Sequence, residues 1–286
     1  SDLSTYNMAI IKTDGTLWTW GNNAQGQMGQ NDQGNAGATS RSSPVAVGAL
    51  TNWLKVAVGD SFVVAIKTDG TLWGWGDSRF GQLGLNDRIS RSSPVQIGAL
   101  TSWADIDANE CVIARKTDGT LWTWGSNGYG QLGQNTAGGN AFTALGNRSS
   151  PVQVGALTNW SQASVGHRGE SPYGASVAVK TDGTLWAWGG NYYGSCGLGD
   201  SYQTNSVRRS SPVQVGALTN WSFAQMGYYH TIGTKTDGTL WSWGRNNFGQ
   251  LGQGDGVSRS SPVQIGALTT WKRGFAGYNF SMGIKS

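Results

Sequence analysis

The chain has 286 residues and a mass of 30.3 kDa, enough to bury a large core in one domain or in two small ones. Its 45 glycines and its 13% of charged residues fit neither a coiled coil nor a highly charged disordered chain, and they favour short strands joined by many turns. The net charge is only +4 and the basic residues are spread along the chain, so we expect no nucleic-acid partner, and the absence of an apolar run of 18 residues predicts no membrane span.

Three blocks of sequence recur five times along the chain. The first block, K-T-D-G-T-L-W-x-W-G, begins at Lys12, and its later copies follow at intervals of 55, 49, 64 and 55 residues. The second block is a G-Q-[LM]-G turn, altered to G-S-C-G at Gly194, and the third is R-S-S-P-V-x-[VI]-G-A-L-T-x-W. All 15 tryptophans fall within the first and third blocks, which indicates an architectural role that they share. A period of this size predicts a propeller or a solenoid.

The first block and the residues before it form a predicted hairpin. In the second unit, Ser61–Lys67 is an apolar, β-branched run of strand length, and Leu72–Gly76 is the return strand. Between them, the Asp-Gly of Thr68–Thr71 supplies the positive φ that a tight turn needs. The two tryptophans of the return strand stand at i and i+2, so they share one face, while Leu72 takes the other. Both faces are apolar, so we expect this strand to be covered on both sides.

Two more strands complete the unit. Pro94 opens a short strand, at a position where no ladder donor is needed. A tryptophan-led run, either Trp53–Val58 or Trp103–Ala108, supplies the fourth strand. Four short antiparallel strands with both faces covered describe a propeller blade. We therefore predict an all-β fold, a β-propeller of about five four-stranded blades, with six or seven blades or a fragment of a longer propeller as alternatives.

Charged residues in the repeat have structural explanations. The aspartate of each T-D-G is foremost a turn former. The arginine of each R-S-S-P is able to bind an anion, but we expect it to hydrogen-bond backbone carbonyls between blades or to pair with an acidic neighbour. Asp105, Asp107 and Glu110 form the one local acidic group. Alternation along a strand puts the two aspartates on one face, where they are able to bind a cation, but we favour a solvated blade end.

The few cysteines and histidines build no familiar reactive site. Cys111 lies in an apolar strand and Cys196 replaces an apolar turn residue, so we expect two free, buried thiols. The two cysteines and two histidines lie too far apart for ordinary zinc-site spacings. A Ser-His-Asp triad would need His167 or His230 as its base. We expect no enzymatic activity, no metal and no cofactor.

One longer pattern joins the blocks. Ile11–Gly29 and Gly227–Gly252 both carry T-D-G-T-L-W-x-W-G followed by G-Q-[LM]-G. In this pattern, repeated five times over essentially the whole chain, the protein resembles the RCC1-like (regulator of chromosome condensation) repeat family, in wording typical of its bacterial, environmental and bacteriophage branch. The resemblance implies a propeller, usually of seven blades, and gives His230 a structural place before an apolar strand. Nucleotide exchange on a small GTPase belongs to part of the family and depends on surface residues that have no match here.

We expect function where the repeats differ, because loops on a rigid scaffold carry binding. The longest differences are Gln30–Ser40, Gln134–Asn147, and the pair His167–Ser176 and Leu198–Arg208. They are rich in Gly, Asn, Ser and Thr, a composition that suits adaptable polar recognition, with plain spacers as the alternative. The candidate binding residues are Phe142, His167, Arg168, Tyr173 and Tyr202.

These features predict a non-catalytic binding or structural module, extracellular or on a virion surface, that recognises a protein or glycan partner through its variable loops. Near-identical repeats, low charge and polar loops favour this role. The alternative is an intracellular, cytoplasmic protein-binding regulator of RCC1 type.

The ends of the chain carry two copies of one strand. Asn7–Lys12 and Phe280–Lys285 both match the apolar strand that precedes the hairpin. We expect residues 1–286 to form one propeller domain in which the N- and C-terminal strands join in one blade. The alternatives are that the spare strand adds to a neighbouring subunit, because an unpaired edge invites pairing, or that the chain is a fragment of a longer propeller.

Overall fold

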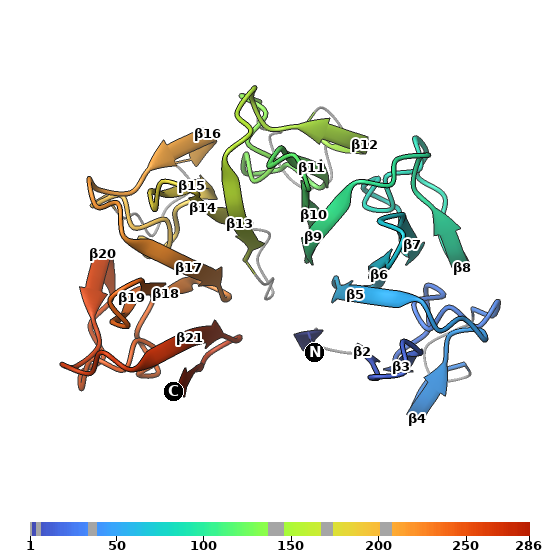
Figure 1. Ribbon diagram of the computed structural model, residues 1–286, viewed down its shortest axis with the longest axis horizontal. Helices are drawn as coiled ribbons and strands as arrows, with labels where there is room; N and C mark the ends of the chain where they lie inside the picture. Colours follow the sequence, from blue (N-terminus) through green and yellow to red (C-terminus); the bar gives the residue numbers. More distant parts are fainter. Residues whose placement is uncertain (1, 4–6, 34–38, 137–145, 167–173, 201–207) are drawn as a thin grey trace. The chain divides into compact units, whose positions relative to one another are not determined.

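The structure of the protein is a computed structural model that describes all residues except 1, 4–6, 34–38, 137–145, 167–173 and 201–207. Within the described residues the regular secondary structure consists of β-strands, which form five four-stranded antiparallel sheets and one two-stranded sheet (Figure 1). The predicted all-β class and the four-stranded blades are thereby confirmed. No helix in the described part of the chain is long and apolar enough to span a membrane.

The strands fall into two compact units. Unit 1 comprises Ser1–Ser126 and Asn147–Gln153, and unit 2 comprises Asn127–Gly146 and Val154–Ser286. Because ring closure concerns both units together, the single domain over residues 1–286 and the joining of its terminal strands stay predictions.

Unit 1 holds three sheets. Sheet 1 contains β1 (Asp2–Leu3), β2 (Asn7–Ile11), β3 (Leu17–Gly21) and β4 (Arg41–Ala46). Sheet 2 contains β5 (Trp53–Val58), β6 (Phe62–Lys67), β7 (Leu72–Gly76) and β8 (Arg91–Gln96). Sheet 3 contains β9 (Trp103–Ala108), β10 (Cys111–Lys116), β11 (Leu121–Gly125) and β12 (Arg148–Gln153).

Unit 2 also holds three sheets. Sheet 4 contains β13 (Trp160–Val165), β14 (Ala175–Lys180), β15 (Leu185–Gly190) and β16 (Arg208–Gln214). Sheet 5 contains β17 (Trp221–Met226), β18 (His230–Lys235), β19 (Leu240–Gly244) and β20 (Arg259–Gln264). Sheet 6 contains β21 (Trp271–Ala276) and β22 (Ser281–Lys285).

Sheets 2 to 5 begin with the tryptophan-led strand and end with the proline strand. β5 pairs with β6, and Trp53 stands opposite Lys67, whereas the next tryptophan-led run opens sheet 3 as β9. Of the two runs left open by the sequence, the fourth strand of the blade is therefore the one that precedes the hairpin. In sheet 1 this place is taken by the two-residue strand β1, and among the described strands β21 pairs with β22 alone.

The hairpin turn is held by a short relay of hydrogen bonds. In sheet 2, Oδ1 of Asp69 accepts from the amide of Thr71 at 2.9 Å and from its hydroxyl at 2.7 Å. Oγ1 of Thr71 in turn accepts from the indole Nε1 of Trp73 at 2.9 Å. These bonds from Thr71 lower the pKa of the Asp69 carboxyl. The turn-forming role of this aspartate is confirmed, and the relay recurs at Asp14, Asp118, Asp182 and Asp237.

Successive sheets pack around the second tryptophan of the hairpin. Trp124 is fully buried, and its Nε1 donates to the backbone carbonyl of Gln82, in the turn of the preceding sheet, at 2.9 Å. A Cβ on Gly84 would lie 2.9 Å from that Nε1, and Gly84 has a φ of +68°, so the turn needs glycine here. We call this arrangement a tryptophan junction. The same indole-to-carbonyl bond joins Trp75 to Gln27, Trp188 to Gln131 and Trp243 to Ser195.

A backbone hydrogen bond ties four of the tryptophan-led strands to the hairpin turn of the preceding sheet in the same unit. In unit 1 the amide of Trp53 donates to the carbonyl of Gly15 at 3.1 Å, and the amide of Trp103 donates to that of Gly70 at 3.2 Å. In unit 2 the bond recurs at 3.0 Å in the pairs Trp221–Gly183 and Trp271–Gly238. Within each unit, neighbouring sheets are therefore joined through the backbone as well as through side chains.

The arginine of R-S-S-P pairs with an acidic neighbour, as expected. Nη2 of Arg91 lies 2.6 Å from Oδ2 of Asp87, and its Nη1 donates to the carbonyl of Ile89 at 2.6 Å. The pair fixes the loop that leads into the proline strand. Further pairs at 2.6 Å are Arg41–Asp32, Arg209–Asp200 and Arg259–Asp255.

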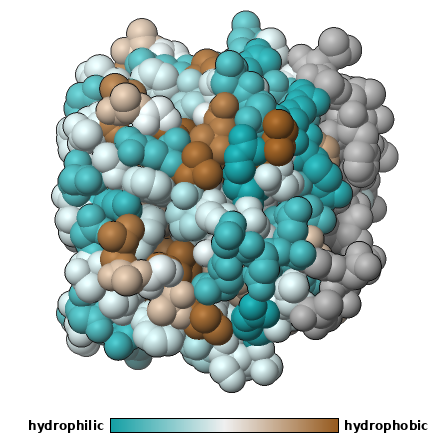
Figure 2. Space-filling model, turned by 90° about the vertical axis from the view of Figure 1, so that its right-hand side faces the viewer, coloured by the Kyte–Doolittle hydropathy of each residue, from teal (hydrophilic) through white to brown (hydrophobic). Residues whose placement is uncertain are grey.

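The side of the molecule drawn in Figure 2 is mainly hydrophilic, and its hydrophobic residues stand in small, separate groups. Scattered exposed apolar side chains are ordinary on protein surfaces. The coloured residues of this view therefore form no large hydrophobic patch.

Candidate functional site

The five binding residues predicted from the sequence lie outside the described residues. They are Phe142, His167, Arg168, Tyr173 and Tyr202, within residues 137–145, 167–173 and 201–207. They stay predictions, as does the role of the long loops in binding.

The other candidate side chains have structural surroundings. Asp105 pairs with Lys55 at 2.6 Å, and the described part of the chain holds no group of three metal-ligating side chains. Cys111 and Cys196 are free and buried, as expected. Burial raises the pKa of Cys196 to about 12, so its thiolate does not form near neutral pH. His230 is fully buried, and its Nε2 lies 3.0 Å from Oγ of Ser281.

Five tyrosines gather in unit 2, in turns from three sheets. Tyr192 and Tyr193 follow β15, Tyr228 and Tyr229 join β17 to β18, and Tyr278 joins β21 to β22. The rings of Tyr228 and Tyr278 stack at 4.4 Å with an interplanar angle of 11°. Tyr229 lies 3.8 Å from Tyr228, and 5.2 and 5.5 Å from the two tyrosines after β15. Segments distant in sequence thus share one continuous aromatic surface, called here, together with Arg245, the tyrosine cluster.

Arg245 brings a positive charge to the tyrosine cluster. It directly follows β19, and its guanidinium carbon lies 5.2 Å from the ring centroid of Tyr193 and 5.9 Å from that of Tyr229. Both distances lie within the range of cation–π attraction. Its buried Nε has no hydrogen-bond acceptor, and no carboxylate pairs with it, among the described residues. An arginine with an unmatched charge and donor is suited to hold an anionic group.

The cluster is partly open to a partner. Tyr278 is exposed, Tyr192, Tyr193 and Tyr228 are half-buried, and Tyr229 is buried beneath them. Burial raises the pKa of the Tyr228 hydroxyl, so that hydroxyl stays protonated and able to donate across the neutral range. Tyr193 has a φ of +56°, a conformation that costs energy for a residue other than glycine. Such outliers gather at functional sites.

Sequence reasoning missed this cluster because it searched where the repeats differ in length. Tyr192 and Tyr193 stand in a turn of constant length, and the other three stand in short turns like the one in sheet 2, so these places differ in residue type. Gly227–His230 reads "GYYH" at the place where Gly59–Phe62 reads "GDSF". The signal that would have found them is variation of residue type within the short turns.

Comparison with known proteins places the chain in a family. The family description "RCC1-like domain" matches residues 4–286, essentially the whole chain. The chain belongs to the RCC1-like family. The resemblance inferred from its repeats is thereby confirmed.

Two curated relatives of this RCC1-like chain are substantially longer. The Ultraviolet-B receptor UVR8 of Arabidopsis thaliana is 31% identical over 253 residues, which cover 85% of this chain and 52% of the receptor. The X-linked retinitis pigmentosa GTPase regulator homolog of Caenorhabditis elegans is 26% identical over 281 residues, which cover 86% of this chain and 20% of the homolog. The chain thus spans about half of the first relative and a fifth of the second.

Solved structures share the fold. Human WBSCR16 superposes with a TM-score of 0.82 at 20% identity, over 99% of this chain and 70% of that one. Yeast RCC1 (Prp20), solved with Kap60 bound to it, superposes with a TM-score of 0.78 at 17% identity, over 98% of this chain and 65% of that one. At these identities the likeness shows the fold, an RCC1-like β-propeller of five to six blades.

Proposed function

We propose that this RCC1-like chain is a non-catalytic protein-binding regulator inside the cell, the alternative that the sequence left open. The tyrosine cluster carries the proposal, because tyrosine and arginine are over-represented among the residues that dominate protein interfaces. Similarity to a receptor and to a GTPase regulator homolog, and a fold shared with a protein solved bound to Kap60, agree with a protein partner. None of these relatives supports a virion, adhesin or glycan-binding role.

The chemistry of the cluster indicates which segment of a partner it contacts. Tyrosine rings offer rigid, flat contact area with hydroxyls at the rim, and they lose little side-chain entropy on binding. Arg245 offers a cation with an unmatched donor in the same surface. We infer that the partner presents a carboxylate flanked by apolar or aromatic side chains. Because the group beside Arg245 is partly desolvated, this contact governs the dissociation rate more than the approach of the partner.

A photocrosslinking experiment tests the location of the surface. A photoreactive phenylalanine analogue replaces Tyr278 in one protein and Leu50, an exposed apolar residue of unit 1, in the control. We expect a cell extract to give a discrete crosslinked protein at Tyr278 and not at Leu50. The same bands at both positions, or none at Tyr278, would contradict the proposal.

Affinity measurements with the crosslinked partner test the residues. The double variant Tyr228→Ala/Tyr278→Ala is expected to bind at least about tenfold more weakly, as interface hot spots do, with a native circular-dichroism spectrum. Leu50→Ala/Leu100→Ala, which removes two exposed apolar side chains of unit 1, is the matched control and should leave the affinity unchanged. Arg245→Gln should weaken binding and flatten its salt dependence, because it removes the charge. Unchanged affinity in both cluster variants would exclude this surface.

A further inference from the structure

The β17–β18 turn and the β21–β22 turn of unit 2 are held together at two places. The amide of Tyr228 donates to the carbonyl of Gly277 at 3.3 Å, and Nε2 of the buried His230 lies 3.0 Å from Oγ of Ser281. A Cβ on Gly227 would lie 2.4 Å from the carbonyl oxygen of Gly277, so glycine allows the two backbones to approach this closely. These contacts fix the position of one turn relative to the other.

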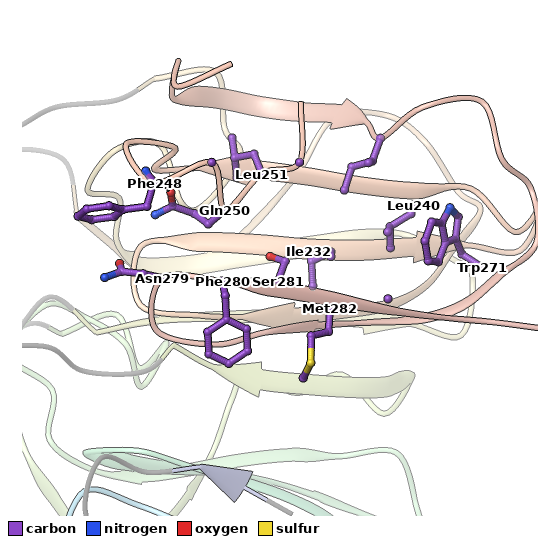
Figure 3. A pocket seen from close by; sticks show the side chains of 14 residues that line it. Ile232, Leu240, Phe248, Gln250, Leu251, Trp271, Asn279, Phe280, Ser281 and Met282 are labelled. Carbon is purple, nitrogen blue, oxygen red and sulfur yellow. Dashed lines mark hydrogen bonds between the residues drawn. The ribbon is translucent and has the colours of Figure 1, made fainter. Parts of the chain in front are cut away.

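The turn that carries Tyr278 also lies beside the segment that follows β19. Asn279, the next residue after Tyr278, lines one pocket together with Phe248 and Phe280 (Figure 3). The guanidinium carbon of Arg245 lies 5.1 Å from the ring centroid of Phe248. The β21–β22 turn is therefore flanked by the β17–β18 turn and by the residues after β19.

Within this arrangement, the rings of Tyr228 and Tyr278 face each other. Their centroids lie 4.4 Å apart, and the ring planes are nearly parallel, with an angle of 11° between them. One ring comes from the turn of sheet 5 and the other from the turn of sheet 6. A covalent bond between the two rings would therefore join two neighbouring sheets of unit 2.

Parallel rings matter for the chemistry of oxidised tyrosine. When a phenol loses an electron and a proton, the unpaired electron occupies p orbitals perpendicular to the ring, with much of its density on the carbons ortho to the oxygen. In a stacked pair these orbitals point at each other. The rings of the other contacts in the tyrosine cluster are inclined to each other, at 79° in Tyr192–Tyr193, 50° in Tyr192–Tyr229, 56° in Tyr193–Tyr229 and 31° in Tyr228–Tyr229.

We propose that Tyr228 and Tyr278 form an oxidative crosslinking site, at which a one-electron oxidant converts the stacked pair into dityrosine. Each phenol loses one electron to the oxidant and its hydroxyl proton to water, so two equivalents of oxidant are reduced. The two radicals couple through a C–C bond between carbons ortho to the oxygens. Each of these carbons then releases its hydrogen as a proton while the oxygen takes one up, which restores both phenols. The net change is the loss of two hydrogen atoms.

The other tyrosines of the cluster give an oxidant further points of attack. The ring centroid of Tyr193 lies 5.5 Å from that of Tyr229, and Tyr229 lies 3.8 Å from Tyr228. Electrons pass readily between aromatic rings at such separations, so a radical formed at Tyr193 is able to reach the stacked pair, where coupling consumes it. The crosslink ties together two turns of the surface proposed above for a protein partner, but its formation needs no partner.

Photo-oxidation of the full chain tests the proposal. The oxidant is ruthenium(III) tris(bipyridine), generated by light and persulfate, with the protein dilute enough to favour reaction within one molecule. The monomer is isolated by gel filtration, measured for dityrosine fluorescence, digested and mapped by tandem mass spectrometry. We expect the peptides of Tyr228 and Tyr278, joined with the loss of two hydrogen atoms, as the most abundant linked pair. No linked peptides in the monomer, or a more abundant link at another pair, would overturn the proposal.

Phenylalanine variants separate the stacked pair from the rest of the cluster. Tyr278→Phe keeps a ring that is able to stack and removes the hydroxyl, so it should abolish both the crosslink and the dityrosine fluorescence of the monomer. Tyr192→Phe removes a hydroxyl from an inclined ring of the same cluster, so this matched control should retain both signals. Circular dichroism checks that each variant is folded. Fluorescence that persists in Tyr278→Phe, or that disappears in Tyr192→Phe, would assign the radical coupling to other rings and refute this site.

Discussion

The turn between the first and second strands of a sheet makes a similar backbone bond to the next sheet in both units and carries different side chains. In unit 1 the amide of Asp60 donates to the carbonyl of Asn109, in the corresponding turn of the next sheet, at 3.0 Å. In unit 2 the amide of Tyr228 donates to the carbonyl of Gly277 at 3.3 Å. In sheets 2 and 3 of unit 1 these turns carry polar and acidic residues, and in sheets 5 and 6 of unit 2 they carry tyrosines.

This difference shows that the repeat uses different groups for stability and for the display of side chains at the surface. The bond between successive turns uses backbone groups alone, so it makes no demand on the side chains that the turns display. The tryptophan junctions and hairpin relays, which do depend on side chains, keep the same tryptophans, aspartates and threonines in both units. Changes to the tryptophan junctions and the hairpin relays should therefore act alike in units 1 and 2.

Removing a junction tryptophan should give the largest effect. Trp124→Ala in unit 1 and Trp243→Ala in unit 2 each delete a fully buried indole and its hydrogen bond to a turn carbonyl. Each should lower the free energy of unfolding by about 3–5 kcal/mol. Guanidinium denaturation followed by far-UV circular dichroism measures both. A loss of unfolding free energy below about 1 kcal/mol in one unit would show that the tryptophan junctions of the two units are not equivalent.

A pair of glycine variants should separate a turn glycine that an indole covers from one with no indole over it among the described residues. Gly84→Ala imposes a φ of +68° on alanine and presses its Cβ against the Trp124 indole at 2.9 Å. Gly252→Ala imposes a φ of +65° with no neighbour nearer than 3.6 Å. Gly252→Ala should cost the left-handed conformation alone, about 1–2 kcal/mol, and Gly84→Ala about 1–3 kcal/mol more. Equal losses in the same denaturation measurement would show that the indole adds nothing.

Acid sensitivity of the hairpin turns should give the smallest effect. Hydrogen bonds from Thr71 and Thr239 lower the pKa of Asp69 and of Asp237 below the ordinary carboxyl value near 3.9. The stability that each carboxylate contributes is therefore present above that value and is lost as the pH falls through the lowered pKa. Asp69→Asn and Asp237→Asn should each make the decline of the urea midpoint below pH 4 shallower, by the same amount in the two units. Identical acid profiles for wild type and both variants would contradict this.

The hairpins and the packing of their tryptophans were predictable from the sequence because their residues recur at fixed spacing. The i, i+2 rule places Leu72 opposite the hairpin tryptophans, and in the structure Leu72 packs with Trp124 on one face of sheet 2 while Trp75 packs with Trp53 on the other. Which tryptophan-led run belongs to a blade was not predictable. A periodic sequence fixes the repeat length and leaves open where one blade stops and the next begins. The hydrogen bond from the Trp53 amide to the preceding sheet is a tertiary contact, and no local sequence pattern predicts it.

The candidate site was less predictable, for a different physical reason. From sequence alone, a tyrosine in a short turn is equally consistent with packing inside the protein and with binding a partner at the surface. The alternatives are separated by the stacking of Tyr228 on Tyr278 across two sheets and by the buried, unmatched Nε of Arg245. Both features join residues many positions apart. A search by loop length selected Phe142, His167, Arg168, Tyr173 and Tyr202 instead, and those positions stay untested.

The backbone bonds that tie a tryptophan-led strand to the hairpin turn of the preceding sheet within a unit have a consequence for how that unit melts. When sheet 1 opens, Trp53 at the start of sheet 2 loses the acceptor for its amide, and the opening of sheet 2 does the same to Trp103. Each sheet thus lowers the barrier for the next, which is nearest-neighbour coupling along the chain. The three sheets of a unit should then unfold as one cooperative transition, and amide exchange should proceed fastest from a sheet that has a neighbour on one side only.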